Sequence, residues 1–301
     1  MSRFGNLDPG LVVRGHGRHY IVEDSEGKRR VCHPRGKKSD CVVGDMVRWA
    51  ETGDEGVIEA VEPRRNLLFR QDEWKTKSFA ANVDQLLVLV AVEPVFSESQ
   101  LARALIAAES AGISTRIAMN KTDLPGVASA RARLQPYRDM GLEVMDVAFV
   151  ADREGSSALL NPWLRGKRTF VMGPSGTGKS TLINLLIPNA QAQIGDISVA
   201  LNSGRHTTTT TQWYWVDSER QTALIDSPGF QEFGLQQIEP MQLPLLMPDL
   251  RAHADHCRFY NCTHQHEPGC GVREAVDAGQ INASRYRIYG EILQELGSKR
   301  Y

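Results

Sequence analysis

Short stretches of alternating apolar and polar residues fill the first 80 positions of the chain. Five of them have the length and composition of β-strands, and turn-forming pieces such as Ser25-Glu26-Gly27 separate them. They cover residues 11–13, 19–22, 30–32, 46–49 and 57–61. This spacing, with no helical period between most of the segments, is typical of a small closed barrel. We therefore predict an N-terminal β-barrel over residues 1–80, with an SH3-like barrel as the nearest alternative.

From residue 82 the pattern changes to strands that alternate with helices. Residues 83–92 are almost all apolar, as expected for a parallel strand buried on both faces. Apolar residues then recur at helical spacing within 100–110. Further strand-like segments follow at 113–119, 144–147, 169–172, 212–216 and 222–225. This alternation predicts an α/β domain over residues 81–239.

The last 60 residues form a third region, which we place at 240–301. It opens with Pro240, Pro244 and Pro248, passes through a cluster of cysteines and histidines, and ends in a polar segment with helical character. We expect one helix over residues 272–296.

Composition narrows the class of protein. Apolar residues make up 41% of the 301 residues and charged residues 24%, with a formal net charge of −1, so no global positive field advertises nucleic acid. The longest wholly apolar stretch, Leu86 to Val92, falls far short of the roughly 20 residues of a membrane span. The first residues show no secretion signal. Three of the five cysteines crowd together, which favours a metal site in a reducing compartment over disulfides. We expect a cytoplasmic protein without a membrane partner.

A phosphate-binding loop is the strongest motif. It follows an apolar strand, precedes a helical pattern, and consists of Gly173, Pro174, Ser175, Gly176, Thr177, Gly178, Lys179, Ser180 and Thr181. Glycines let the backbone N–H groups turn toward phosphate oxygens, and the helix N-terminus adds partial positive charge. Lys179 is expected at the β- and γ-phosphates of the nucleotide, and the Ser180 hydroxyl on Mg²⁺.

A second motif indicates which base is bound. Asn120, Lys121, Thr122 and Asp123 follow the strand at 113–119. The Asp123 carboxylate can accept hydrogen bonds from guanine N1–H and the 2-amino group, which adenine does not match. Lys121 would lie on the base, and Asn120 would brace the loop. The alternative is an ordinary polar turn after a buried strand.

A third motif, Asp226-Ser227-Pro228-Gly229, ends the strand at 222–225. Asp226 would hold the water shell of Mg²⁺, and the Gly229 N–H would contact the γ-phosphate. In ordinary GTP-binding domains the phosphate loop comes first and the guanine motif last, whereas here the guanine motif precedes both others. Because the termini of a domain often lie close together, one sheet can be cut in a loop and rejoined there. We therefore predict a circularly permuted GTPase domain that binds GTP and GDP.

The hydrolytic machinery is less defined. Phe230 follows Gly229, where many GTPases place a glutamine that orients the attacking water, and a phenyl ring cannot do this. We hypothesise that His206 supplies the catalytic group; alternatively it helps its segment to fold or to meet RNA. A threonine from Thr207 to Thr211, which we assign as Thr208, would complete the Mg²⁺ site.

The C-terminal cysteines predict a structural metal site. Cys257, Cys262 and Cys270 lie within fourteen residues, with His264 between them. Three thiolates and one imidazole make a closed tetrahedral Zn²⁺ site with no position for a substrate. His253, His256 and His266 are alternative fourth ligands.

These features together resemble one family, the ribosome small-subunit-dependent GTPases known as RsgA, YjeQ or EngC. The resemblance spans essentially the whole chain: the barrel, the permuted motifs, the segment Gly204-Arg205-His206-Thr207-Thr208 and the C-terminal cysteines. It implies an OB-fold barrel, a zinc-binding helical C-terminal domain and His264 as the fourth zinc ligand. It also implies GTP hydrolysis stimulated by the small ribosomal subunit, in late maturation of that subunit. At 144–148, where the family's fifth, base-supporting motif would fall, Val147 stands in place of a common serine, so that motif is unassigned.

The expected partners are the small ribosomal subunit and its rRNA, bound by a monomer. Basic clusters in the barrel region, such as Lys28-Arg29-Arg30 and Arg64-Arg65, are candidate RNA contacts or simply solvated faces. An alternative function is an RNA-binding assembly factor that uses GTP as a switch with negligible turnover. A P-loop ATPase is a third possibility, in which the guanine motif would be coincidental.

Overall fold

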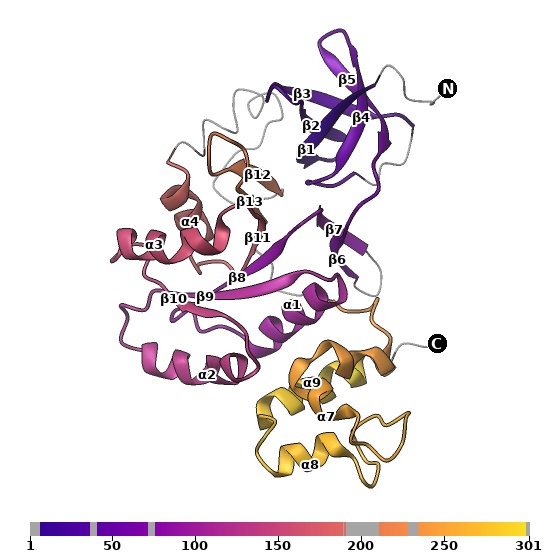
Figure 1. Cartoon of the computed structure of the whole chain (residues 1–301), viewed down its shortest axis with the longest axis vertical. Coiled ribbons are helices and arrows are strands. Elements are labelled where there is room, and N and C mark those ends of the chain that lie inside the picture. The colour runs from indigo at the N-terminus through magenta and orange to yellow at the C-terminus, as the bar shows by residue number, and fades with distance from the viewer. Residues whose placement is uncertain are drawn as a thin grey trace.

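The N-terminal region is a closed five-stranded barrel in the computed structural model, which describes residues 7–36, 41–71, 76–188, 190, 211–227 and 234–298. Its strands are β1 (Asp8–His16), β2 (His19–Glu23), β3 (Arg29–Pro34), β4 (Met46–Thr52) and β5 (Glu55–Val61). They pair in the order β1-β2-β3-β5-β4, and β4 returns to β1. The pair β3–β5 is parallel and the others are antiparallel. The predicted barrel is confirmed, with the strand order of an OB-fold rather than of the SH3-like alternative (Figure 1).

The central region is the predicted α/β layer. Its strands are β8 (Gln85–Ala91), β9 (Ser114–Asn120), β10 (Val144–Asp146), β11 (Arg168–Met172), β12 (Gln212–Trp215) and β13 (Ala223–Asp226). They run in the order β10-β9-β8-β11-β13-β12, parallel except for β12 at the edge. The helices are α1 (Glu98–Ser110), α2 (Val127–Asp139), α3 (Arg153–Leu164) and α4 (Lys179–Leu186).

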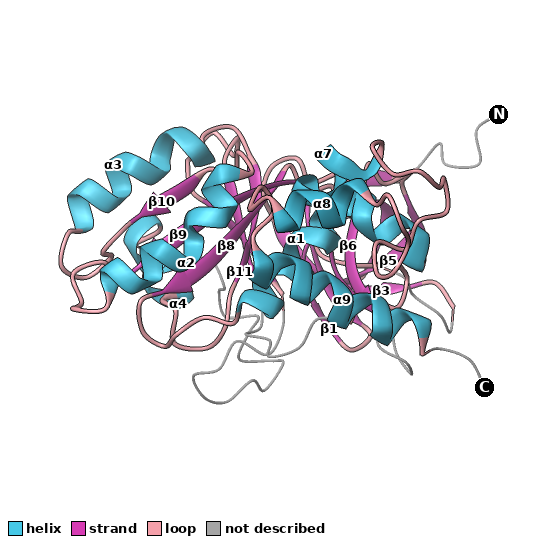
Figure 2. Ribbon diagram, turned by 90° about the horizontal axis from the view of Figure 1, so that it is seen from below, coloured by secondary structure: helices cyan, strands magenta, loops and turns pink. Residues whose placement is uncertain are grey.

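Both faces of this sheet are covered. Along β8, Leu86, Val88 and Val90 pack into one hydrophobic cluster, whereas Leu87 and Leu89 pack into another. The first cluster includes side chains of α1, α2 and the C-terminal helices, and the second those of α3 and α4. Figure 1 shows α1 and α2 on one side of the strands and α3 and α4 on the other, and Figure 2 shows the same elements turned by 90°. Because successive strand residues point to opposite faces, the continuous apolar run of β8 is explained by burial on both sides.

A hairpin of β6 (Leu67–Gln71) and β7 (Thr76–Ala81) links the barrel to β8 and was not predicted. Leu67, Leu68 and Phe69 are three consecutive apolar residues, so the sequence shows no alternation there. The pairing register shifts between Leu68 and Phe69, and this β-bulge accounts for the broken pattern.

The C-terminal region contains the 3₁₀ helix η1 (Pro240–Leu246) and helices α7 (Pro248–Ala254), α8 (Gly271–Asp277) and α9 (Ala283–Gly297). The prediction of one helix over 272–296 was wrong, because two helices occupy that range. Gly279 has a φ of +71°, which ends α8 in the left-handed conformation that favours glycine. The Asn282 side chain then accepts a hydrogen bond from the Ser284 N–H and caps α9.

The barrel is joined to the sheet at two places. Arg14 of β1 pairs with Gln212 of β12, so the strands of both regions form one eleven-stranded sheet. Beside this pair, the buried Glu23 carboxylate accepts hydrogen bonds from Trp215 (2.7 Å) and Arg29 (2.8 Å). Since Trp215 lies on β12, the edge of the sheet is held against the barrel wall.

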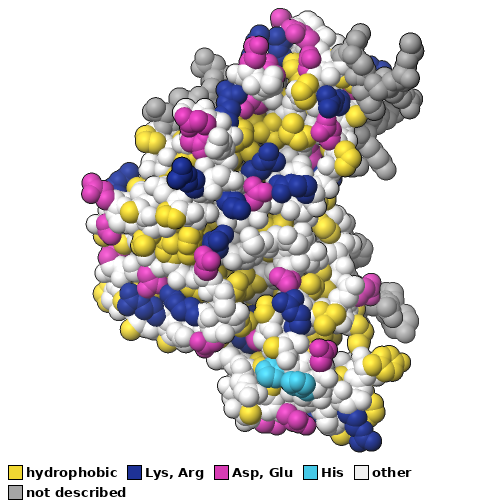
Figure 3. Space-filling view, in the orientation of Figure 1, with side chains coloured by type: hydrophobic (Ala, Val, Ile, Leu, Met, Phe, Trp, Pro, Cys, Tyr) yellow, Lys and Arg dark blue, Asp and Glu magenta, His cyan; other side chains and the backbone are white. Residues whose placement is uncertain are grey.

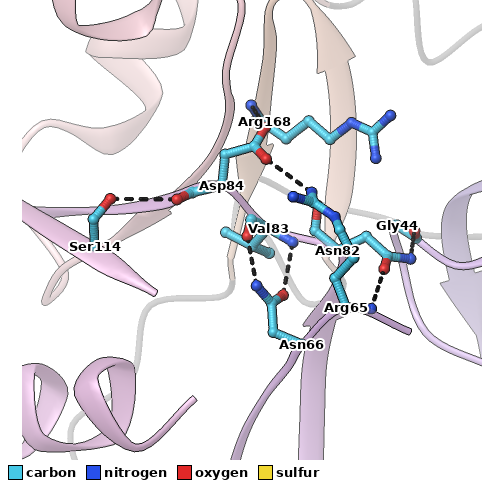
Figure 4. Close-up of polar contacts among 8 residues, drawn as sticks. All are labelled: Gly44, Arg65, Asn66, Asn82, Val83, Asp84, Ser114 and Arg168. Carbon is cyan, nitrogen blue, oxygen red and sulfur yellow. Dashed lines mark hydrogen bonds and ion pairs between the residues drawn. The ribbon is translucent and has the colours of Figure 1, made fainter. Parts of the chain in front are cut away.

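The second junction surrounds Asn82, a buried residue with a φ of +56° (Figure 4). Its side chain donates to the Gly44 carbonyl and accepts from the Arg65 N–H, both at 2.9 Å. Asp84, two residues on, accepts from the Arg65 guanidinium and from the backbone N–H of Arg168, each at 2.8 Å. These bonds connect a barrel loop, the segment after β5 and the first residues of β8 and β11.

Candidate nucleotide and metal sites

The three predicted nucleotide motifs follow strands of the same parallel sheet. β9 ends at Asn120, β11 ends at Met172 just before the phosphate loop, and β13 ends at Asp226. Because these strands are parallel, their carboxyl ends lie at one edge, where ligands bind in open α/β sheets. The inverted order of the motifs along the chain therefore does not separate them in space.

Asn120 joins the predicted base loop to the phosphate loop. Its buried side-chain amide donates a hydrogen bond to the Thr177 carbonyl at 2.9 Å. Its amide oxygen accepts from the Phe149 N–H at 3.1 Å. Three segments that are distant in sequence thus meet at one residue, as a single nucleotide pocket requires.

The phosphate loop depends on glycine at its closest contacts. Gly178 has a φ of +105°, and an added Cβ there would collide with Nδ2 of Asn120. A Cβ at Gly173 would collide with the carbonyl oxygen of Leu89. Thr177 is buried and donates through its hydroxyl to the Pro174 carbonyl at 2.9 Å, whereas Ser175, Gly176 and Ser180 are exposed. The absence of a side chain at these two glycines allows the loop to approach the Asn120 side chain and the Leu89 carbonyl this closely.

Lys179 begins α4 and is folded back over the loop. Its Nζ donates to the carbonyls of Gly173 (2.7 Å) and Pro174 (3.0 Å). Burial lowers the pKa of Lys179, and the negative charge of Asp226 opposes this shift. An anion arriving in the loop would compensate the desolvated ammonium group.

The base loop, residues 120–123, is fixed by its backbone conformation and by hydrogen bonds to a neighbouring segment. Lys121 has a φ of +63°, and the Thr122 N–H and hydroxyl both donate to the Val147 carbonyl, at 3.2 and 3.0 Å. Asp123 is exposed beyond this turn and Thr181 is half-buried on α4. Residues 147–149 lie directly against the base loop and contact it through backbone atoms. They overlap the segment 144–148, where the fifth motif was expected. Sequence reasoning missed Phe149 because its contribution is a main-chain N–H.

Asp226 is buried at the end of β13, and the neighbouring Ser227 hydroxyl donates to the Val171 carbonyl at 2.8 Å. Four further predicted positions, namely His206, Thr208, Gly229 and Phe230, lie outside the described residues.

The C-terminal cysteines gather into one cluster with His264. The ligand atoms of Cys257, Cys262, His264 and Cys270 all lie within 4.8 Å of one another. Nδ1 of His264 is 3.4 Å from Sγ of Cys257 and 3.5 Å from Sγ of Cys270. The other three candidate histidines are not part of this cluster. Four converging soft and borderline ligands can hold a metal ion in tetrahedral geometry.

The metal-ligand loop, residues 257–270, is held in place by side chains of α9. His264 has a φ of +59°, and its carbonyl accepts a hydrogen bond from Tyr286 of α9 at 2.6 Å. Tyr289 donates in the same way to the Thr263 carbonyl at 2.8 Å. Burial lowers the pKa of His264, which favours the neutral imidazole that binds metals. Burial raises the pKa of the Cys262 thiol to about 12, and a bound cation would reverse that penalty by stabilising the thiolate.

The basic clusters of the barrel region are largely neutralised. Arg29, Arg30, Arg35, Arg64 and Arg65 each form an ion pair with a carboxylate. On the face shown in Figure 3, basic and acidic side chains are interspersed rather than gathered. None of the described helices has the length and apolar character needed to cross a bilayer.

Comparison with known proteins found a matching family model and relatives of high sequence identity. A family model described as RsgA GTPase matches residues 61–236. The "Small ribosomal subunit biogenesis GTPase RsgA" of Variovorax paradoxus is 60% identical over 300 residues, covering 98% of this chain and 94% of the relative. The protein of the same name from Bordetella pertussis is 52% identical and covers 98% of both chains.

Two solved structures resemble the whole fold. The crystal structure of YjeQ from Thermotoga maritima has a TM-score of 0.74 at 31% identity, covering 98% of this chain and 100% of the other. That of YloQ, described as a circularly permuted GTPase, has a TM-score of 0.71 at 27% identity, covering 100% and 99%.

Proposed function

Because the chain belongs to the RsgA GTPase family, we propose that this GTPase acts in biogenesis of the small ribosomal subunit, with its hydrolysis stimulated by that subunit. The observation that carries the nucleotide part is the Asn120–Thr177 hydrogen bond, which couples the guanine loop to the phosphate loop. The ribosomal part rests on the names of relatives that align over nearly the full chain. Such a role would place the protein in the cytoplasm.

The site residues keep their proposed roles. The phosphates of GTP would lie on the loop from Gly173 to Thr181, with Lys179 released from the carbonyls it now contacts. The base would be read by Asp123 and covered by Lys121, while Asn120 and Thr122 brace the loop. Gly229 would contact the γ-phosphate.

Magnesium fits the oxygen-bearing groups at this edge, because Asp226 is a buried carboxylate at a strand end and Ser180 is exposed at the start of α4. Thr208 is proposed to complete the set, and the ion would supply charge neutralisation on the phosphates. We keep His206 as the proposed catalytic group in place of a glutamine. A His206→Ala variant assayed in single turnover on the subunit tests this, and an unchanged rate with retained binding would exclude it.

The four-ligand cluster is proposed to hold one structural Zn²⁺. All four positions are protein ligands, so none is left for substrate, and the thiolate-rich set suits zinc. The domain limits 1–80, 81–239 and 240–301 remain proposals, as does the monomeric state.

Co-sedimentation with isolated small subunits tests the ribosomal proposal. With a GTP analogue, the protein should pellet with the subunits more than with GDP, and binding should weaken as salt rises if it contacts rRNA phosphates. Multiple-turnover phosphate release, measured with and without subunits, separates the stimulated enzyme from the switch that barely turns over. Equal pelleting in all nucleotide states, with no stimulation, would contradict the proposal.

A further inference from the structure

Arg14 is a barrel residue whose positive charge is buried at the edge of the GTPase sheet. The residue is 9% exposed, and its Nε and Nη1 atoms have no hydrogen-bond partner among the described residues. No ion pair to Arg14 is found in the part of the chain that the structure describes. Burying a guanidinium group without a paired anion is costly. An anion that arrives near Arg14 would reduce this cost.

A β-bulge directs this side chain. The register of β1 against β2 shifts between Val12 and Arg14, so Arg14 pairs with Ile21. Val12 packs in the barrel core, and regular alternation would have pointed residue 14 there too. Ile21 packs outside that core, in the cluster shared with the sheet. Bulges commonly redirect a side chain toward a functional site.

Arg14 stands in a row with Asp226. Gln212 of β12 lies opposite Arg14 on one side and opposite Asp226 of β13 on the other, so the three residues lie side by side on neighbouring strands. All three are buried, and the Oε1 atom of Gln212 also has no hydrogen-bond partner among the described residues. Two strand spacings put the Cα atoms of Arg14 and Asp226 about 10 Å apart.

A neighbouring side chain is influenced by the charges of both residues. The pKa of Tyr214, two residues after Gln212 on the same face, is raised to about 12, first by burial and then by the charge of Asp226, whereas the charge of Arg14 lowers it. Both charges therefore act on the same small volume beneath the nucleotide edge of the sheet.

We propose that Arg14 is a specificity-determining residue through which the barrel favours GTP over GDP in the nucleotide site. This inference rests on the proposed nucleotide pocket. The phosphate loop opens from β11, the strand beside β13, so the phosphates lie at the same end of the sheet as the row. The γ-phosphate adds negative charge at that end of the sheet, and its interaction with a buried cation is weakly screened by solvent. GDP lacks the γ-phosphate, so the charge of Arg14 stabilises bound GDP less than bound GTP.

Arg14→Met tests the proposal by removing the charge while keeping an apolar stem. Thermal unfolding without nucleotide should occur at an equal or higher temperature, because the uncompensated burial is relieved. The affinity for a fluorescent non-hydrolysable GTP analogue should fall about tenfold more than that for fluorescent GDP. Arg14→Lys, which keeps the charge, should retain most of the preference for GTP.

Arg30→Met is the matched control, because Arg30 is a barrel arginine already paired with Glu51. It should leave the ratio of the two affinities unchanged. An unchanged ratio in Arg14→Met, or its failure to fold, would overturn the proposal, since Arg14 would then serve structure alone. If the unaltered protein binds neither nucleotide, it is the proposed function that fails.

Discussion

Gly178 controls how closely the phosphate loop approaches the base loop. An alanine there would place a methyl group against Nδ2 of Asn120, in a backbone conformation that costs an L-residue roughly 1–2 kcal/mol. We expect Gly178→Ala to break the Asn120–Thr177 hydrogen bond and weaken GTP binding at least tenfold, as measured with a fluorescent analogue. Gly166→Ala is the control, because Gly166 has a φ of +68° with no atom near the added Cβ. Equal affinities for the two variants would contradict the coupling.

Base choice is proposed to depend on Asp123. Replacement by asparagine removes one acceptor and presents a donor in its place, so Asp123→Asn should disfavour guanine and favour xanthine, whose 2-position accepts. Competition between GTP and xanthosine triphosphate for one labelled nucleotide measures the change, and we expect the preference to invert by 10-fold or more. Asp139→Asn, an exposed change on α2, should not alter it. If Asp123→Asn still prefers GTP, another group reads the base.

Residues proposed to act through a side chain in a local motif can be assigned from sequence. Lys179 and Asp123 belong to this group, because spacing within a few positions defines each motif. Arg14 and Phe149 could not, since the role of each is set by a strand or loop distant in sequence. The bulge that redirects Arg14 leaves no mark in the hydrophobic pattern.

At the scale of elements, burial decides what the pattern reveals. β8 was predictable because both its faces are buried in separate clusters, which makes nearly every residue apolar. The break between α8 and α9 was missed because apolar residues recur at helical spacing on each side of it, at Val272 and Ala275 and again at Ile288 and Ile292. Gly279 and Asn282 end and restart the helix, but each is also tolerated inside one.

The burial of apolar side chains does not by itself explain how the metal-ligand loop folds. Cys262→Ser should lower the zinc content from the proposed one per chain toward zero and destabilise α8 and α9, because Cys262 lies in the same hydrophobic cluster as Ile288 and Tyr289. Metal analysis and thermal unfolding measure this. Cys32→Ser, a buried cysteine of the barrel, should lose stability but keep its zinc. Zinc loss in Cys32→Ser, or none in Cys262→Ser, would contradict the assignment.

At the scale of the whole molecule, two junctions tie the barrel to the sheet. The Glu23 contacts hold it at the β12 edge, and the Asn82 junction holds it at the starts of β8 and β11, the end of the sheet opposite the nucleotide. Neither was foreseen from sequence, because each junction joins residues that lie far apart along the chain. Their positions imply that the barrel and the sheet unfold together.

Hydrogen exchange tests whether the barrel and the sheet unfold together. A GTP analogue at 100 times its dissociation constant should slow exchange in amides that open only by global unfolding about 100-fold. The effect should appear in β4 of the barrel as well as in β8, if both belong to one cooperative unit. Asn82→Ala removes the bonds to Gly44 and Arg65, so it should speed exchange in β4 and reduce the nucleotide effect there. The exposed Asn161→Ala on α3 should do neither. Protection confined to β8 in the unaltered protein would mean that the barrel opens independently of the sheet.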